Sequence, residues 1–151
     1  WLTTSQQTSW RDYMVGTTAL TEQLDRDLRQ THGLSLHEYE ILVRLSEVPG
    51  HAIRMAELAQ SVSHSRSRIT HTVSRLERLD YVRRGQCSEG GRGVSAVMTD
   101  AGRAALTDAA HTHVRGVHRL LIENASDDEL EVVGRVFARV LDTLNCPRLP
   151  A

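Results

Sequence analysis

The segment from residue 61 to residue 84 has hydrophobic and polar positions that repeat with the period of an α-helix. Intervals of three and four residues predict a buried stripe made of Ile69, Val73, Leu76 and Leu79. The opposite face then carries only polar or cationic side chains, namely His64, Ser67, Arg68, His71, Ser74, Arg75 and Arg78. The segment holds six arginines against Glu77 and Asp80, a local charge of +4 in a chain whose net charge is −1. Such a helix suits a negatively charged groove that is lined with hydrogen-bonding edges.

A shorter helix is predicted just before this one, over residues 55–61. A Ser-rich turn, in which Ser63 or Ser65 is available as N-cap, joins the two helices. Two helices joined in this way form a helix-turn-helix, whose second helix enters the major groove of DNA.

A β-hairpin is predicted after the helix pair. Residues 81–86 and 94–98 have the pattern of two strands, and Gly90, Gly91 and Gly93 predict the turn between them. A helix-turn-helix that is followed by such a hairpin is a winged helix. Arg92 falls at the hairpin tip, where it would reach a minor groove or a phosphate.

Amphipathic helices are predicted on both sides of the winged helix, so the fold class is mainly α with a small β-wing. Residues 9–31 form one helix ended by Gly33, and Ser35 with Glu38 makes a capping box that opens a helix running to about Glu47. Further helices start at caps made by Thr99 and by Ser126 with Glu129. The apolar stripes of the first and last helices are Trp10, Tyr13, Met14, Thr17, Leu20, Leu24 and Leu28, and Leu130, Val133, Val136, Phe137, Val140, Leu141 and Leu144.

Composition restricts the function classes. The 151 residues suffice for one domain, and the near-neutral net charge of −1 means that DNA binding must come from a segregated cationic patch. Neither a run of about 18 apolar residues nor the pattern of a signal peptide occurs, which favours the cytoplasm and no membrane association. Cys87 and Cys146 lie far apart and do not suggest a disulfide framework. No phosphate-binding loop, Gly-x-Ser-x-Gly or His-Glu-x-x-His motif occurs, so we expect neither an enzyme nor a cofactor.

The apolar stripes of the terminal helices exceed what a small winged helix can bury. The economical solution is that they pack against a second copy, because two-fold homodimers are the commonest oligomers. We therefore expect residues 1–33 and 107–151 to form a dimerisation region and residues 34–106 to form the DNA-binding domain. Two recognition helices about 34 Å apart would then read a pseudo-palindrome in double-stranded DNA.

Residues 34–106 resemble the MarR family of bacterial transcription regulators. The resemblance rests on Leu34 to Leu45, Arg54 to Ala59, Ser63 to Leu76, and the wing with the following Met98 to Leu106. It implies a dimeric regulator, commonly a repressor, that a small molecule releases from its operator. The chain departs from the family pattern in two places. Gly90 and Gly91 stand where an Asp often precedes the wing arginine, and Asp80 stands where a Gly often ends the recognition helix.

The pattern and the resemblance together suggest which residues contact DNA. Those expected at base edges are Ser67, Arg68, His71 and Arg75, and those expected at phosphates or in the minor groove are Ser65, Arg78, Arg84 and Arg92. The alternative is that these arginines simply form a solvated face.

An effector site is implied as well, because members of the family often bind phenolic or other aromatic acids between the dimer helices and the winged helix. The candidate lining is Trp10, Tyr13, Thr17, His37, Tyr39 and Arg44, in which aromatic walls and one cation suit an aromatic carboxylate. Alternatively, the aromatic residues fill the core.

Two further alternatives concern the histidines and Cys87. Zinc sensing through His111, His113 and His118 lacks a closed ligand set, and redox sensing at Cys87 would rely on nearby arginines that favour the thiolate. We expect no metal. A helical interaction module that does not bind DNA is a third alternative, but it leaves the Gly-rich wing and the segregated arginines unexplained.

Overall fold

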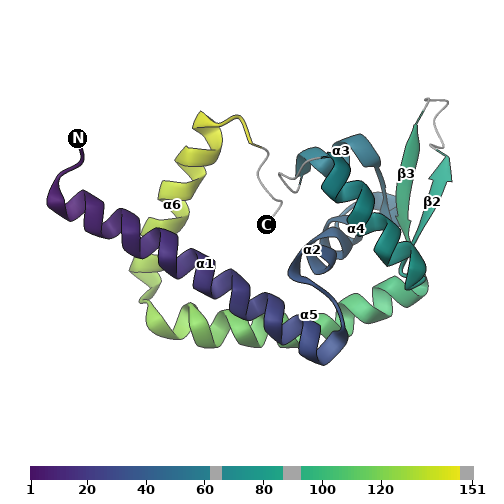
Figure 1. Ribbon diagram of the computed structural model, residues 1–151, viewed down its shortest axis with the longest axis horizontal. Helices are drawn as coiled ribbons and strands as arrows, with labels where there is room; N and C mark the ends of the chain where they lie inside the picture. Colours follow the sequence, from purple (N-terminus) through teal and green to yellow (C-terminus); the bar gives the residue numbers. More distant parts are fainter. Residues whose placement is uncertain (62–65, 87–92, 147–151) are drawn as a thin grey trace.

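The computed structural model describes residues 1–61, 66–86 and 93–146, and within these ranges it leaves out the side chains of Ser61, Arg66 and Gln86. A winged helix lies at one end, and two long helices run away from it toward a third at the far end (Figure 1). The helices are α1 (Thr4–His32), α2 (Leu36–Ser46), α3 (Met55–Ser61), α4 (Arg66–Arg78), α5 (Asp100–Leu120) and α6 (Asp127–Thr143), with short 3-10 turns η1 (Pro49–His51) and η2 (Ile122–Asn124). The strands are β1 (Ala52–Arg54), β2 (Val82–Gln86) and β3 (Val94–Met98).

The strands form one antiparallel sheet in the order β1-β3-β2. The predicted hairpin is confirmed, with Arg84 of β2 paired to Ala96 of β3. The sequence did not predict β1, whose Ile53 pairs with the other side of Ala96. Three residues are too few to show an alternating pattern, and β1 depends on pairing with a strand more than forty positions away.

The core lies where α2, α3 and α4 meet the sheet and the inner ends of α1 and α5. Ile69, Val73 and Leu76 of α4 are buried, as their spacing predicts. The prediction for Leu79 is wrong, because its side chain is 39% exposed. Helix α4 ends at Arg78, so Leu79 lies in the turn that follows, next to Asp80 with its left-handed φ of 58°, and its side chain does not continue the buried stripe.

The predicted helix ends are largely confirmed. Ser35 with Glu38 and Ser126 with Glu129 form capping boxes, and Gly33 ends α1 in the left-handed conformation at φ 67°. One boundary differs from the prediction. Helix α1 begins at Thr4 rather than at residue 9, because Thr3 and Gln6 form a further capping box.

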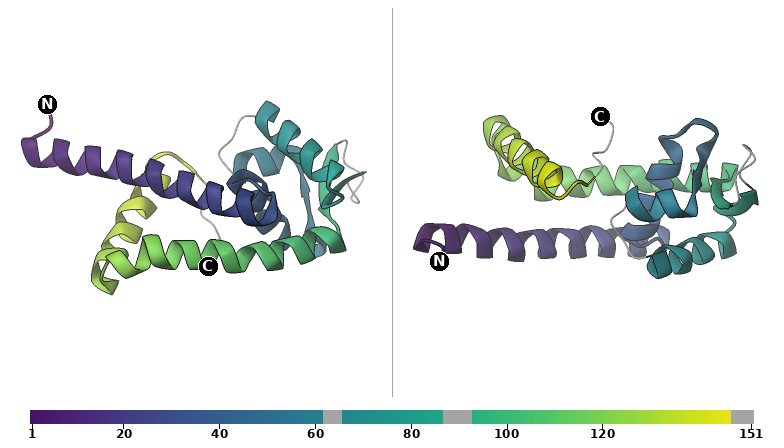
Figure 2. Two further views of the ribbon diagram at one scale, coloured as in Figure 1. Left: turned by 60° about the horizontal axis from the view of Figure 1, so that its bottom comes forward. Right: turned by 90° about the horizontal axis from the view of Figure 1, so that it is seen from above.

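The long helices α1 and α5 run side by side (Figure 2). Gly116 allows this approach, since a Cβ there would lie 2.7 Å from Cδ2 of Leu24. A hydrogen bond of 2.8 Å between Nε2 of His32 and Oγ1 of Thr112 adds a polar link between the two helices.

Large apolar side chains of the outer helices remain exposed. On α1, Trp10 and Met14 are exposed, and α6 buries none of its side chains. Tyr13 and Phe137, whose ring centroids are 5.2 Å apart, join α1 to α6 without covering either stripe. No helix in the described part of the chain combines the length and the apolarity that a membrane crossing requires.

We expect Gly102→Ala to destabilise the fold, because a Cβ at position 102 would lie 2.1 Å from the carbonyl oxygen of Tyr81. Overpacking against backbone costs about 1–3 kcal/mol, so the midpoint of thermal unfolding should fall by several degrees. Gly134→Ala in α6 is the matched control, since nothing lies within 4 Å of its added Cβ. Equal stability of the two variants would contradict the close approach of α5 to Tyr81.

Candidate nucleic-acid interface

Helix α4 presents its polar side chains in two rows. Residues seven apart on a helix lie almost above one another, so Ser67, His71 and Arg78 form one row and Arg68 and Arg75 form another. The side chains of the first row are exposed. Arg78 forms no ion pair with any carboxylate that the structure describes. This row forms an exposed polar strip along α4.

The strand β2 is fastened to α4 by Arg84. Its Nε donates to Oε2 of Glu77 at 2.9 Å, and its Nη2 donates to Oγ of Ser74 at 2.9 Å. Arg84 therefore sets the angle between the wing and α4. The side chain of Arg84 is 38% exposed, so a phosphate can still approach its guanidinium.

The second row faces α1 and α2. Arg68 lines a polar crevice of about 440 Å³ between these helices and α4. The other lining residues are Thr21, Glu22, Asp25, Arg26, Arg29, Leu36 and His37. Three arginines and two carboxylates line the crevice, where Arg29 pairs with Asp25 and Arg26 with Glu22, so the excess of positive charge is one.

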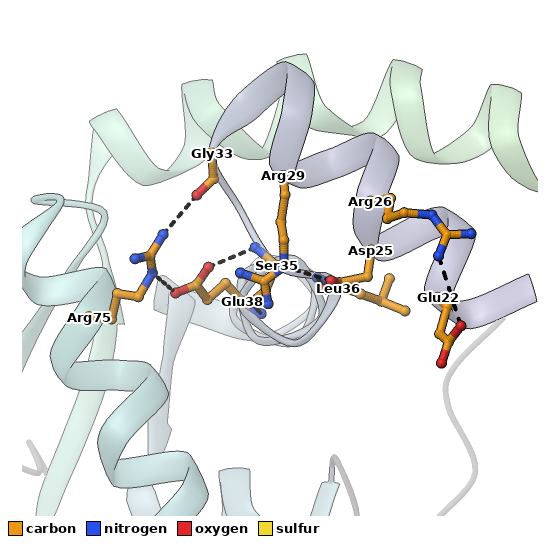
Figure 3. A network of polar contacts seen from close by, with 9 residues as sticks. All are labelled: Glu22, Asp25, Arg26, Arg29, Gly33, Ser35, Leu36, Glu38 and Arg75. Atoms are coloured by element: carbon orange, nitrogen blue, oxygen red, sulfur yellow. Dashed lines mark hydrogen bonds and ion pairs between the residues drawn. The ribbon is translucent and has the colours of Figure 1, made fainter. Parts of the chain in front are cut away.

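Arg75 reaches the corner where α1 turns into α2 (Figure 3). Its Nε donates to Oε1 of Glu38, and its Nη2 donates to the carbonyl oxygen of Gly33 at 2.9 Å. The sequence predicts that Glu38 caps α2 but gives no sign of this second role, because Arg75 is 37 positions away. Arg75 is thus placed in contact with protein, whereas the pattern suggests a base contact.

A second carboxylate fixes the same corner. Asp25 accepts the backbone N–H of Leu36 at 2.8 Å and Nε of Arg29 at 2.6 Å. Burial raises the pKa of Asp25, but the hydrogen bonds from Arg29 and Leu36 outweigh this effect and lower the pKa below its ordinary value. Asp25 therefore stays ionised and holds the start of α2 against α1.

Several residues expected from the sequence to act in binding or sensing lie outside the described residues. These are Ser65 and Arg92, expected at DNA, and Cys87, considered as a redox sensor. In the described ranges, no three His, Cys, Asp or Glu side chains are grouped so that they could hold a metal ion.

The expected effector residues fall into two groups within one chain. Trp10, Tyr13 and Thr17 lie on the exposed outer part of α1, whereas the other three belong to α2. His37 lines the crevice, and Arg44 pairs with Glu47 at 3.0 Å. One chain does not bring the two groups together. Helix α2 meets α1 at Asp25, which binds Leu36, and residue 13 lies about 18 Å farther along α1.

Tyr39, the remaining expected effector residue, is buried between α2 and α5. Its ring stacks on that of His113 with centroids 4.6 Å apart. Nδ1 of His113 is buried, and no described residue bonds to it. Burial lowers the pKa of His113, although the carboxylate of Glu40 opposes part of this shift. His113 is therefore neutral in the folded protein at neutral pH.

The three-stranded sheet, the helix pair α3–α4 and the exposed polar row define the class of winged helix-turn-helix DNA-binding proteins. A family model described as "MarR family" matches residues 32–93. The chain is 36% identical to AbsC, a MarR family transcriptional regulator from Streptomyces coelicolor, covering 96% of this chain and 97% of that one with a TM-score of 0.90. It is 34% identical to Sco3205 from the same organism, a MarR family transcriptional regulator solved in complex with DNA. That match covers 100% of this chain and 96% of the other, with a TM-score of 0.91.

A curated relative is the HTH-type transcriptional repressor YetL of Bacillus subtilis. It is 29% identical over 112 residues, which are 72% of this chain and 66% of YetL. This chain belongs to the MarR family of transcriptional regulators, whose members bind DNA and are not enzymes. The family resemblance inferred from the sequence is thereby confirmed, and so is the mainly α fold with a β-wing.

The half-buried His113 should make the fold sensitive to acid. Its pKa is depressed in the folded state, so the unfolded chain takes up its proton first as the pH falls below about 6.5. Stability contributed by neutral His113 is complete above that pH and is lost as the pH falls toward the folded pKa. We expect thermal unfolding midpoints to fall less between pH 7 and pH 5 in His113→Phe than in the wild type.

His111→Phe is the matched control, because position 111 is exposed on the same helix. This variant should keep the pH dependence of the wild type. Parallel pH profiles for the wild type and His113→Phe would show that His113 does not contribute.

Proposed function

We propose that this chain is a homodimeric, sequence-specific transcriptional regulator that binds a pseudo-palindromic operator, represses transcription there and is released by a small aromatic acid. The observation that carries the proposal is the exposed row of Ser67, His71 and Arg78 on the second helix of a helix-turn-helix. The relative solved in complex with DNA, similar over the whole chain, supports DNA as the partner. The relative named as a repressor supports repression.

The exposed apolar stripes of the outer helices support a homodimer. Helix α6 buries no residue within one chain, and Val133, Val136 and Val140 are each at least 40% exposed. Exposed stripes of this length mark an interface. A second copy related by a two-fold axis would cover α1 and α6 together. The exposed stripes therefore support residues 1–33 and 107–151 as the dimerisation region.

The proposed dimer sets the geometry of DNA binding. Two copies of α4 separated by about 34 Å would enter successive major grooves on one side of the duplex. Ser67 and His71 would then face base edges, while Arg78 and Arg84 would lie near phosphates. Arg68, at the border of the crevice, is positioned to contact either DNA or an effector.

The polar crevice supports release by a small acid. Arg26, Arg29, His37 and Arg68 place cationic or titratable groups around its volume. A carboxylate bound there would touch α1, α2 and α4 at once, so it would act on the angle between α4 and the dimer helices. In a dimer, the aromatic side chains at positions 10 and 13 are available to complete the lining from the second copy.

DNA binding is tested by fluorescence anisotropy on the DNA upstream of the chain's own gene, with an unrelated duplex of equal length and a salt series. We expect tight, salt-sensitive binding that prefers the upstream DNA. His71→Ala should weaken operator binding by about 5- to 150-fold, because a base contact is worth about 1–3 kcal/mol, and should change binding to the unrelated duplex little. Benzoate or salicylate added in the same assay tests release.

Thr107→Ala, at an exposed position of α5 away from α4, is the control and should bind as the wild type does. The proposal fails if the wild type binds neither duplex at low salt.

Dimerisation is tested by Val136→Asp, which places a carboxylate in the apolar stripe of α6. A buried unpaired charge should raise the dimer dissociation constant by at least about tenfold. Sedimentation equilibrium would measure the change. Arg139→Asp puts the same side chain on the polar face of α6 and should leave the dimer intact. A wild-type monomer at micromolar concentrations, or an intact Val136→Asp dimer, would exclude this interface.

A further inference from the structure

The guanidinium of Arg75 is engaged on the protein side of the recognition helix. It donates to a carboxylate oxygen of Glu38 and to the carbonyl oxygen of Gly33, so it bridges α4 to the corner between α1 and α2 (Figure 3). The side chain of Arg75 is 43% exposed, whereas that of Glu38 is 2% exposed. The partly exposed guanidinium of Arg75 therefore donates to the buried carboxylate of Glu38.

Glu38 needs this partner. One of its oxygens accepts the backbone N–H of Ser35 at 2.7 Å, which completes the capping box of α2, and the other accepts from Arg75. A buried carboxylate that loses its cation is strongly destabilised. If Arg75 turned toward DNA, Glu38 would keep only the cap bond. Contact with a base edge would therefore compete with a favourable interaction that is already made.

The carbonyl oxygen of Gly33 is a second acceptor for Arg75 and restricts the orientation of its guanidinium. Gly33 ends α1 at φ 67°, and its N–H closes the last turn of α1 by donating to the carbonyl of Arg29. The carbonyl of Gly33 is left to accept from Arg75 at 2.9 Å. The Nε–H and Nη2–H groups of Arg75 thus bind two acceptors at fixed positions, Glu38 and Gly33. This pair of bonds fixes the orientation of the guanidinium as well as its distance from the corner.

We propose that Arg75 is a positioning residue, which holds the recognition helix at a fixed angle to α1 and thereby contributes to operator specificity without contacting DNA. This inference rests on the proposed dimeric, DNA-binding function. In a dimer, the separation of the two α4 helices depends on the angle between α4 and α1 in each copy. A specific operator demands one separation, whereas non-specific binding along phosphates tolerates many.

The test compares Arg75→Gln, Glu38→Gln, their double variant and Arg78→Gln on operator and unrelated duplexes across a salt series. Each of the first two should weaken operator binding about tenfold or more, leave unrelated DNA within about twofold, and keep the salt slope of the wild type. The double variant should be no weaker than the weaker single variant, because both changes break one interaction. Arg78→Gln should weaken both duplexes and lower the slope by about 1.8, because each copy in the dimer loses one phosphate contact.

Arg75→Lys separates positioning from a charge contact. Lysine keeps the positive charge but cannot donate in the fork that joins Glu38 to Gly33. Positioning predicts that Arg75→Lys behaves like Arg75→Gln, whereas a phosphate contact predicts recovery of the wild-type slope and affinity. Circular dichroism and sedimentation confirm that each variant is folded and dimeric before binding is measured.

The inference is overturned if Arg75→Gln lowers the salt slope and Arg75→Lys restores it. It is also overturned if Glu38→Gln binds the operator as tightly as the wild type does. Failure of the proposed function has a different signature, because the wild type itself would then show no preference between the two duplexes.

Discussion

The buried carboxylate of Glu38 is the constraint on which the arrangement of the DNA-reading end depends. It is a buried polar group that requires hydrogen-bond donors, and it takes them from the start of its own helix and from Arg75 of α4. Asp25 fixes the same corner from α1 by binding Leu36 and Arg29. Three helices from separate parts of the sequence are thereby held together by two carboxylates (Figure 3).

The corner between α1 and α2 connects the winged helix to the outer helices. Gly116 lets α1 pack closely on α5, and the two extend together away from the winged helix (Figure 2). Their free ends and α6 carry apolar stripes that one chain does not cover. In the proposed dimer these stripes bring two copies together, and the Glu38 corner transmits their relative placement to the two recognition helices. A ligand in the adjacent crevice would act on the same joint.

Local patterns predicted much of this fold because their causes are local. The stripe of α4, the capping boxes at Ser35 and Ser126, and the strands of the hairpin follow from spacing and from short-range hydrogen bonds. The exposure of Leu79, the strand β1 and the contact between Arg75 and Glu38 were not predicted, for one common reason. The chain turn at Asp80, the pairing with β3 and the salt bridge to Glu38 all depend on a particular backbone turn or a distant partner. A helical period shows on which face of α4 Arg75 lies, but it does not show that Glu38 and Gly33 lie opposite that face.

The most direct test measures the separation of the two recognition helices in the DNA-free protein. A spin label at His71→Cys, in a chain with Cys87→Ser and Cys146→Ser, reports this separation by pulsed electron paramagnetic resonance. The account predicts a single narrow distribution consistent with helices about 34 Å apart, and a broader one when Glu38→Gln is added. A wild-type chain with no dipolar coupling, or with a distribution as broad as that of Glu38→Gln, would contradict it.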